Sequence, residues 1–281
     1  MLIPLPLQLL IGLILSSLIG LLAYRRGSLS KSGVLGAVLV GTAIFGFGGL
    51  AWGLILIVFF VTSSLLSHYK EASKEGLAEK FDKGHQRDLG QALANGGAGA
   101  LIAVVSVVVP TSFWWAAFLG AMATVTADTW ATELGVLNTT SPRLITTGKT
   151  VEVGTSGGVS LRGMVAALSG AVVIGAAASL FLLAQRLLLG STSDVSLRMT
   201  ITVAALGGVA GSLFDSLLGA TVQAIYFCPT CQKETERKLH TCGTPTTIKR
   251  GWRWLNNDWV NFISSLFGAA ISAGLWMLIT L

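Results

Sequence analysis

Long apolar segments, separated by short polar stretches, run along almost the whole chain. Most of the eight segments approach the roughly 20 residues that an α-helix needs to cross a bilayer core. The pattern predicts an all-α protein, a polytopic transmembrane helix bundle of about eight spans, with a range of six to eight. The segments are Leu7–Tyr24, Val34–Phe47, Leu50–Ser67, Leu93–Val109, Phe113–Val125, Val165–Leu189, Ile201–Leu218 and Phe262–Leu281.

The break between the second and third segments rests on Gly46–Gly49 alone. It fits either a hairpin of two helices or one long, interrupted span.

Composition agrees with a membrane protein. Of the 281 residues, 52% are hydrophobic and 11% are charged, whereas a soluble domain is about 25% charged. The 34 glycines suit helices that approach each other closely in lipid. The first segment is not expected to be a cleaved signal peptide, because it has no charged leader and is followed by Arg25 and Arg26. We expect one integral membrane domain, residues 1–281.

The distribution of basic residues predicts the orientation. With the N-terminus outside and eight spans, 17 of the 19 Lys and Arg residues fall in cytoplasmic loops, and only Arg186 and Arg198 do not. This partition follows the positive-inside rule. The net charge of +6 therefore reflects topology and anionic lipid heads rather than nucleic-acid binding. Because the long loops are all on this side, we expect the active face to be cytoplasmic.

The first long loop, residues 68–88, has charged residues at helical spacing. One interpretation is a solvated or interfacial helix. The alternative gives Lys83, His85 and Arg87 a phosphate-binding role, just before a span that contains Asn95. An unpaired amide at the depth of Asn95 would be costly, so it needs a partner.

Three carboxylates lie in or beside apolar segments: Asp128 and Glu133 at the end of the fifth, and Asp215 within the seventh. Each costs about 2.5–3.5 kcal/mol at the middle of a membrane helix and therefore needs a partner. Gly211 and Gly219 flank Asp215 at four-residue spacing, which predicts a face where another segment approaches closely.

A fourth acid, Asp258, stands beside Asn257 and Asn261 at the start of the last segment. Carboxylates that approach phosphates usually share Mg²⁺ with them, because like charges otherwise repel. The alternatives are a proton relay and structural pairing with Lys or Arg.

The segment "GKTVEVGTSGG", from Gly148 to Gly158, is rich in glycine and hydroxyl residues. It is not a Walker A motif, because Arg143 stands where that motif requires glycine. Exposed backbone N–H groups, the charge of Lys149 and nearby hydroxyls suit a polyphosphate. A plain turn is the alternative.

Four stretches resemble the signatures of a membrane family that includes the phytyl-phosphate kinases of tocopherol synthesis, formerly catalogued as a domain of unknown function. They are "ADTWATELG", "SPRLITTGKTVEVGTSGGVSLRG", "GSLFDSLLGATVQ" and "NNDWVNFISS". The resemblance covers nearly the whole chain. A more distant similarity is to CTP-dependent dolichol and phytol kinases, whose acid matches Asp128. Their loop matches Lys149, Thr150, Glu152, Gly154 and Thr155, with Val153 inserted.

The resemblance implies phosphoryl transfer from a nucleoside triphosphate, CTP above all, to a prenyl monophosphate such as phytyl or geranylgeranyl phosphate. It implies that Asp128, Lys149, Asp215 and Asp258 are catalytic, and that the three aspartates hold Mg²⁺. The implied substrate and nucleotide ligands are Asn95, Glu133, Arg143, Gly148, Thr150, Glu152, Gly154, Thr155, Gly157, Gly158, Asn257 and Asn261. A lipid-phosphate carrier and a cytidylyltransferase that releases pyrophosphate are the competing hypotheses.

The cytoplasmic loop 223–256 holds all three cysteines of the chain. Cys228 and Cys231 form a CxxC pair, and His240 and Cys242 follow. On the reducing side of the membrane we expect no disulfide. Four ligands at this spacing suit a structural Cys₃His zinc site; a redox CxxC or incidental thiols are the alternatives.

Overall fold

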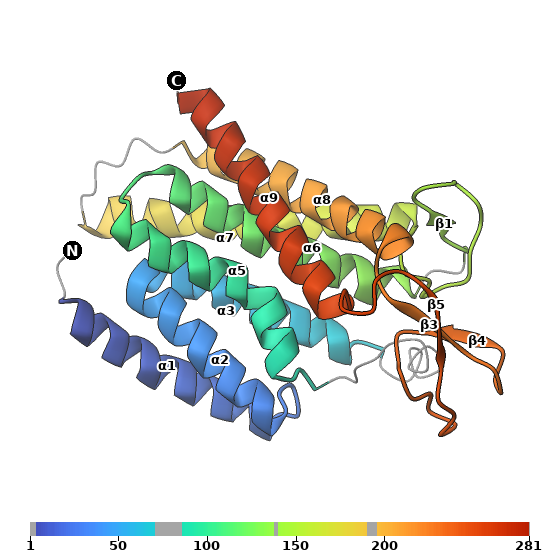
Figure 1. Cartoon of the computed structure of the whole chain (residues 1–281). Coiled ribbons are helices and arrows are strands. Elements are labelled where there is room, and N and C mark those ends of the chain that lie inside the picture. The colour runs from blue at the N-terminus through green and yellow to red at the C-terminus, as the bar shows by residue number, and fades with distance from the viewer. Residues whose placement is uncertain (1–3, 71–85, 138–139, 190–195, 281) are drawn as a thin grey trace.

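A computed structural model describes residues 4–70, 86–137, 140–189 and 196–280. These residues form a bundle of eight long helices with short strands at one end (Figure 1). Seven of these helices are long and apolar enough to cross a membrane, so the predicted polytopic helix bundle is confirmed. The helices are α1 (Leu5–Arg25), α2 (Lys31–Ala43), α3 (Leu50–His68), α5 (Leu89–Val108), α6 (Phe113–Gly135), α7 (Leu161–Leu189), α8 (Leu197–Thr221) and α9 (Asn257–Thr280).

The second and third apolar segments form two separate helices. A π-helical turn, η1 (Ile44–Gly48), extends α2, and α3 begins at Leu50. Between them Gly49 has a φ of +83° and a ψ of −171°, a conformation that is essentially restricted to glycine. The chain reverses there, so the hairpin is the correct alternative.

Helix α6 lies at the centre of the bundle and contacts α3, α5, α7, α8 and α9. Every residue from Ala116 to Ala127 is buried. The helix faces protein on all sides, and it is the one long helix of the described residues that is not apolar enough to count as a span by itself. Glycine makes its packing possible, since a Cβ at Gly208 of α8 would lie 2.8 Å from that of Ala123.

Five short strands cap one end of the bundle. β1 (Arg143–Leu144) pairs antiparallel with β2 (Gly158–Val159), and Arg143 lies opposite Val159. β3 (Ile225–Cys228), β4 (Lys233–Thr235) and β5 (Thr247–Arg250) form an antiparallel sheet in the order β4-β3-β5. No strand was predicted, because two to four residues are too few to show an alternating pattern.

The α1–α2, α6–α7 and α8–α9 connections all lie at this end of the bundle (Figure 1). The chain enters α5 here too, where Ser30 N donates to Arg87 O and Arg87 N donates to Ser28 O, at 3.0 and 3.1 Å. Most of the helix considered for residues 68–88 falls on residues 71–85, outside the described residues. The common position of these connections agrees with the predicted orientation, which remains a prediction.

Candidate functional site

A cavity of about 620 Å³ lies at the end of the bundle that carries the strands. Residues of α5, α6, α7, α8 and α9, of the glycine-rich loop and of the segment after β4 line it. It gathers eleven of the predicted site residues from five separate parts of the chain: Asn95, Asp128, Glu133, Gly154, Thr155, Gly157, Gly158, Asp215, Asn257, Asp258 and Asn261.

Asp215 on α8 occupies a position where glycines let two other segments approach. A Cβ at Gly211 would collide with Thr124 of α6, and one at Gly219 would lie 3.1 Å from the backbone nitrogen of Gly157. The close approach predicted from the glycine spacing is therefore present on both sides of the acid. Asp215 Oδ2 is buried and has no hydrogen-bond partner within the described part of the chain.

Asp128 on α6 lines the same cavity and lies close enough to Asp215 for the two charges to interact. Two like charges in an enclosed site require a proton or a cation between them. Oxygen donors from carboxylates are the ligands that Mg²⁺ takes. Together with the unpartnered Asp215 Oδ2, they make a donor set that fits this ion.

The three predicted Mg²⁺ ligands do not form a compact cage. Among the described residues, the only group of three or more Cys, His, Asp or Glu side chains with ligand atoms within 4.8 Å of one another is the cysteine group. Asp258, at the start of α9, shares the cavity with Asp128 and Asp215. This arrangement suits Mg²⁺, which takes one or two carboxylates and completes its shell with phosphate oxygens and water.

Two asparagines bring amide groups to the cavity wall. Asn95 Nδ2 on α5 donates to the backbone oxygen of Gln91 at 2.9 Å. Asn261 Nδ2 on α9 donates to Asn95 Oδ1 at 3.5 Å. The partner expected for Asn95 is thus present, while Asn261 Oδ1 is buried without a partner among the described residues.

Arg87 also lines the cavity, although sequence reasoning assigned it a phosphate-binding role only as an alternative. Its guanidinium lies over the rings of Phe59 and Phe60, 5.5 and 5.6 Å from their centres, and donates to Ser64 Oγ at 3.4 Å. Burial lowers the pKa of Arg87 to about 10, against the opposing effect of the Glu133 carboxylate. The sequence feature that suggested its role was its position just before the α5 segment. Lys83 and His85, which were considered together with it, lie outside the described residues.

Glu236, just after β4, is a second cavity residue that sequence reasoning missed. Its Oε1 accepts hydrogen bonds from Gln223 Nε2 at 2.8 Å and from Ser156 Oγ at 3.1 Å. Nothing in the sequence around it distinguishes it from the other charged residues of its loop. Its position follows from the packing of the sheet against the glycine-rich loop.

The glycine-rich loop is a hairpin built on β1 and β2. Gly148, Gly154 and Gly157 have φ values of +67°, +80° and +85°, a region that favours glycine. The second half of the hairpin, from Gly154 to Gly158, lines the cavity.

The hairpin tip does not reach the cavity. Arg143 donates to Gly148 O at 3.0 Å, outside the cavity wall. The predicted ligands outside the cavity wall, all exposed, are Arg143, Gly148, Lys149, Thr150 and Glu152. The structure does not bring them into the cavity with the aspartates, and their role stays a prediction. A hairpin presents only one of its ends to the bundle, and loop composition does not reveal which.

A second, smaller pocket of about 70 Å³ lies among α1, α2, α3 and α5. Its walls are mostly apolar and include Ala37, Leu56 and Phe60. Arg87, Gln91 and Asn95 line this pocket as well as the polar cavity. The apolar pocket and the polar cavity therefore meet at Arg87, Gln91 and Asn95.

The four predicted zinc ligands do come together, in the connections of the β4-β3-β5 sheet. Their ligand atoms lie within 4.8 Å of one another, so the group can hold a metal ion.

The fold and the cavity define a class: a multi-pass helical membrane protein with carboxylates, amides and one arginine enclosed at one end of the bundle. The chain belongs to the integral membrane protein family DUF92, which matches residues 14–269. The predicted membership of a membrane family once catalogued by unknown function is confirmed.

Relatives come from plants and archaea. Protein PGR of Arabidopsis thaliana is 35% identical over 95% of each chain. An uncharacterized membrane protein of Methanocaldococcus jannaschii is 30% identical over 94% of this chain and 92% of its own. Protein VTE6, chloroplastic, of Arabidopsis thaliana is 28% identical over 87% of this chain and 64% of its own. No solved structure matches the chain significantly.

Proposed function

We propose that this protein is an integral membrane kinase that transfers a phosphoryl group from a nucleoside triphosphate, with CTP as the expected donor, to a prenyl monophosphate such as phytyl or geranylgeranyl phosphate. The observation that carries the proposal is that the carboxylate-lined cavity and the apolar pocket meet at Arg87. The motifs that resemble phytyl-phosphate kinases support it, and so does the similarity to Protein VTE6.

An amphiphilic acceptor matches the two pockets. The prenyl chain passes through the pocket among α1, α2, α3 and α5, which at about 70 Å³ holds only part of it, and its phosphate meets the guanidinium of Arg87. Arginine recognises phosphate through two parallel hydrogen bonds, and a partly dehydrated guanidinium strengthens them. Gln91 and Asn95, on the same boundary, orient the phosphate oxygens.

The reaction needs positioning and charge neutralisation more than covalent catalysis. An oxygen of the prenyl phosphate attacks the γ-phosphorus, and the bond to the β–γ bridging oxygen breaks. Its electron pair stays on the departing nucleoside diphosphate. The acceptor is already an anion, so no general base is required. Asp128, Asp215 and Asp258 would hold Mg²⁺, which supplies neutralisation of the triphosphate charge.

Other cavity groups bind phosphate oxygens. The backbone between Gly154 and Gly158 turns through two positive-φ glycines, and such turns present N–H groups to anions. Asn257 and Asn261, which line the cavity from α9, orient the transferred group.

The exposed hairpin tip contacts the part of the nucleotide that extends from the cavity. The shared hairpin of Lys149, Arg143, Gly148, Thr150 and Glu152 supports this role. Lys149→Ala is expected to raise the KM for the nucleotide several-fold and to leave the KM for the prenyl phosphate unchanged. The basic residues of the connections support a cytoplasmic position for this face, where nucleotides are found.

The test uses purified protein in detergent with Mg²⁺, phytyl or geranylgeranyl phosphate, and CTP or ATP in parallel. Prenyl diphosphate is followed by mass spectrometry, and the nucleotide product distinguishes a kinase from a cytidylyltransferase, which releases pyrophosphate. Asp128→Asn should abolish turnover, while Glu234→Gln, an exposed carboxylate paired with Lys249 at 2.6 Å, should not. Absence of product with every combination would contradict the proposal, and prenyl-phosphate movement in liposomes would then favour a carrier.

A further inference from the structure

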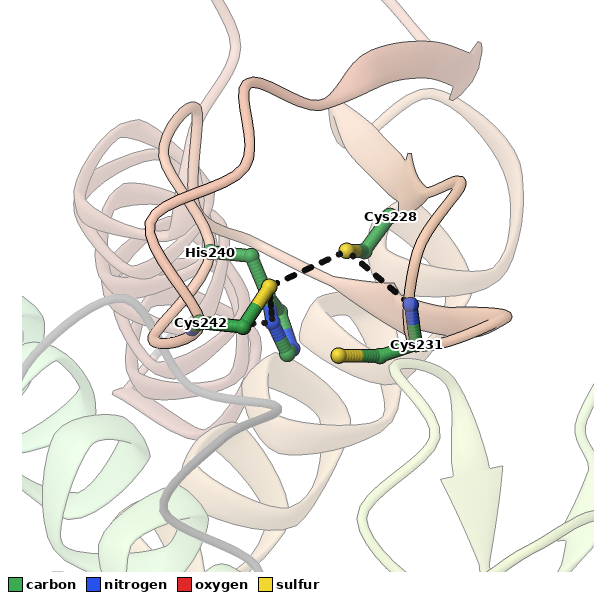
Figure 2. Close-up of side chains that lie close together, drawn as sticks. All are labelled: Cys228, Cys231, His240 and Cys242. Carbon is green, nitrogen blue, oxygen red and sulfur yellow. Dashed lines mark hydrogen bonds between the residues drawn. The ribbon is translucent and has the colours of Figure 1, made fainter.

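Four potential metal ligands meet beside the β4-β3-β5 sheet, outside the cavity. Cys228 ends β3, Cys231 follows in the turn to β4, and His240 and Cys242 belong to the connection between β4 and β5. Figure 2 shows their side chains converging on one centre. Cys228 Sγ and Cys242 Sγ are 3.7 Å apart, and His240 Nδ1 lies 3.1 Å from Cys242 Sγ.

The sulfur separation fits a metal site and excludes a disulfide. A disulfide would bring two sulfurs to about 2.05 Å, and all three cysteines are free. In a tetrahedral site with Zn–S bonds of about 2.3 Å, two sulfurs lie about 3.8 Å apart. The 3.7 Å between Cys228 and Cys242 matches that edge.

The buried imidazole of His240 belongs to the same group of side chains. His240 is 3% exposed, and its Nε2 has no hydrogen-bond partner within the described residues. An unsatisfied buried polar atom in a native fold commonly marks an ion or a water. Three thiolates and one imidazole select zinc among common metals, and four protein ligands leave no open position for catalysis.

The sheet has little else to hold it together. Its strands are three or four residues long, and units of this size usually need a metal, a disulfide or a partner surface. Its anchors on the bundle lead to the cavity. Arg250, at the end of β5, donates to Gly219 O at 2.6 Å and to Ser156 O at 3.3 Å. Glu236 joins Ser156 to Gln223.

We propose that Cys228, Cys231, His240 and Cys242 bind one zinc ion in a closed structural site, and that this ion holds the sheet on the glycine-rich loop and so places Glu236 at the cavity. Zinc binding then determines the geometry of the cavity wall without taking part in chemistry. The site is independent of the reaction proposed above.

Metal content of the purified full-length protein in detergent tests the site directly. Mass spectrometry of the elements should find one zinc per chain in the wild type and in Thr230→Ala, an exposed neighbour in the same turn. Cys231→Ser should lose the zinc. Iron in place of zinc, or zinc that survives in Cys231→Ser, would overturn the assignment.

The link to the cavity is tested on the wild-type protein, which avoids a variant that fails to fold. A strong chelator should expose both the 223–256 segment and the glycine-rich loop 141–160 to protease, and added Zn²⁺ should restore their protection. Cleavage confined to 223–256 would overturn the link. Neither readout uses substrate, so neither depends on kinase activity.

Discussion

The side-chain amide of Asn261 on α9 donates a hydrogen bond of 3.5 Å to Asn95 Oδ1 on α5, although 166 residues separate them. Each asparagine stands near the start of an otherwise apolar helix, where an amide without a partner is costly. Their contact closes one wall of the cavity and leaves Asn261 Oδ1 buried and unpartnered in the described structure. That oxygen is therefore available to a ligand bound in the cavity.

Asp215→Asn should separate activity from stability. The amide keeps the shape of the side chain but removes one of two interacting charges. We expect turnover to fall about 100-fold or more, the scale on which loss of one electrostatic contact slows catalysis. The melting temperature should stay the same or rise, because an enclosed charge near a second carboxylate destabilises the fold. A variant that unfolds at lower temperature would show that Asp215 is a structural partner instead.

Arg87→Gln should weaken binding of the prenyl phosphate. A hydrogen bond to a charged group contributes about 1.5–3 kcal/mol, so the KM should rise by about tenfold or more, with a smaller change in kcat. Arg253→Gln, which removes an exposed arginine, is the matched control, and Arg87→Lys should recover part of the affinity. Equal KM values in the two glutamine variants would contradict this role.

The same arginine predicts a pH dependence. Burial lowers the pKa of Arg87 to about 10, so the cation is present below that pH and is lost as the pH rises through it. The affinity of the wild-type protein for the prenyl phosphate should therefore fall above about pH 10. The Arg87→Lys and Arg87→Gln variants provide the comparison, and the latter should show no such fall.

Ala37→Phe should change the preference for chain length. Ala37 lines the apolar pocket, and a phenyl ring there shortens the space for a prenyl tail. The ratio of kcat/KM for geranylgeranyl over geranyl phosphate should fall by about tenfold, since each lost methylene contact contributes about 1–3 kcal/mol. Leu39→Phe, on the exposed side of α2 at 53% exposure, should leave the ratio unchanged. An unchanged ratio in both variants would place the tail elsewhere.

Gly211→Ala should destabilise the protein by about 1–3 kcal/mol, because the new methyl group collides with Thr124. Gly274→Ala is the matched control: no atom lies within 4 Å of its added Cβ, so it should be neutral or stabilising by up to about 1 kcal/mol. Thermal unfolding in detergent measures both. Equal melting temperatures would show that α6 and α8 are less tightly packed than described.

The helices could be predicted because each long apolar segment indicates a membrane helix without reference to the rest of the chain. The reversal at Gly49 could only be narrowed to two alternatives, since composition does not report φ. Asp128 and Asp215 could each be predicted to need a partner, because a carboxylate in an apolar helix is costly without one. These inferences depend on local sequence and on the cost of burial.

What could not be predicted depends on how distant segments pack. Lys149 and Thr155 stand in the same glycine-rich segment, yet only Thr155 lines the cavity. Glu234 and Glu236 are two residues apart, and one is in an exposed ion pair while the other faces the cavity. Arg87 was considered only as one of three basic neighbours. The direction in which a loop folds decides each case.

The central position of α6 has a consequence for biogenesis. A helix that is too polar to count as a span by itself has little favourable free energy of insertion when it enters the bilayer without other helices. Its stable insertion therefore requires α7, α8 and α9, which follow it in the sequence and pack against it. Insertion of the segment that carries Asp128 thus depends on the neighbouring helices. In chains truncated before α9, this segment should be only partly inserted.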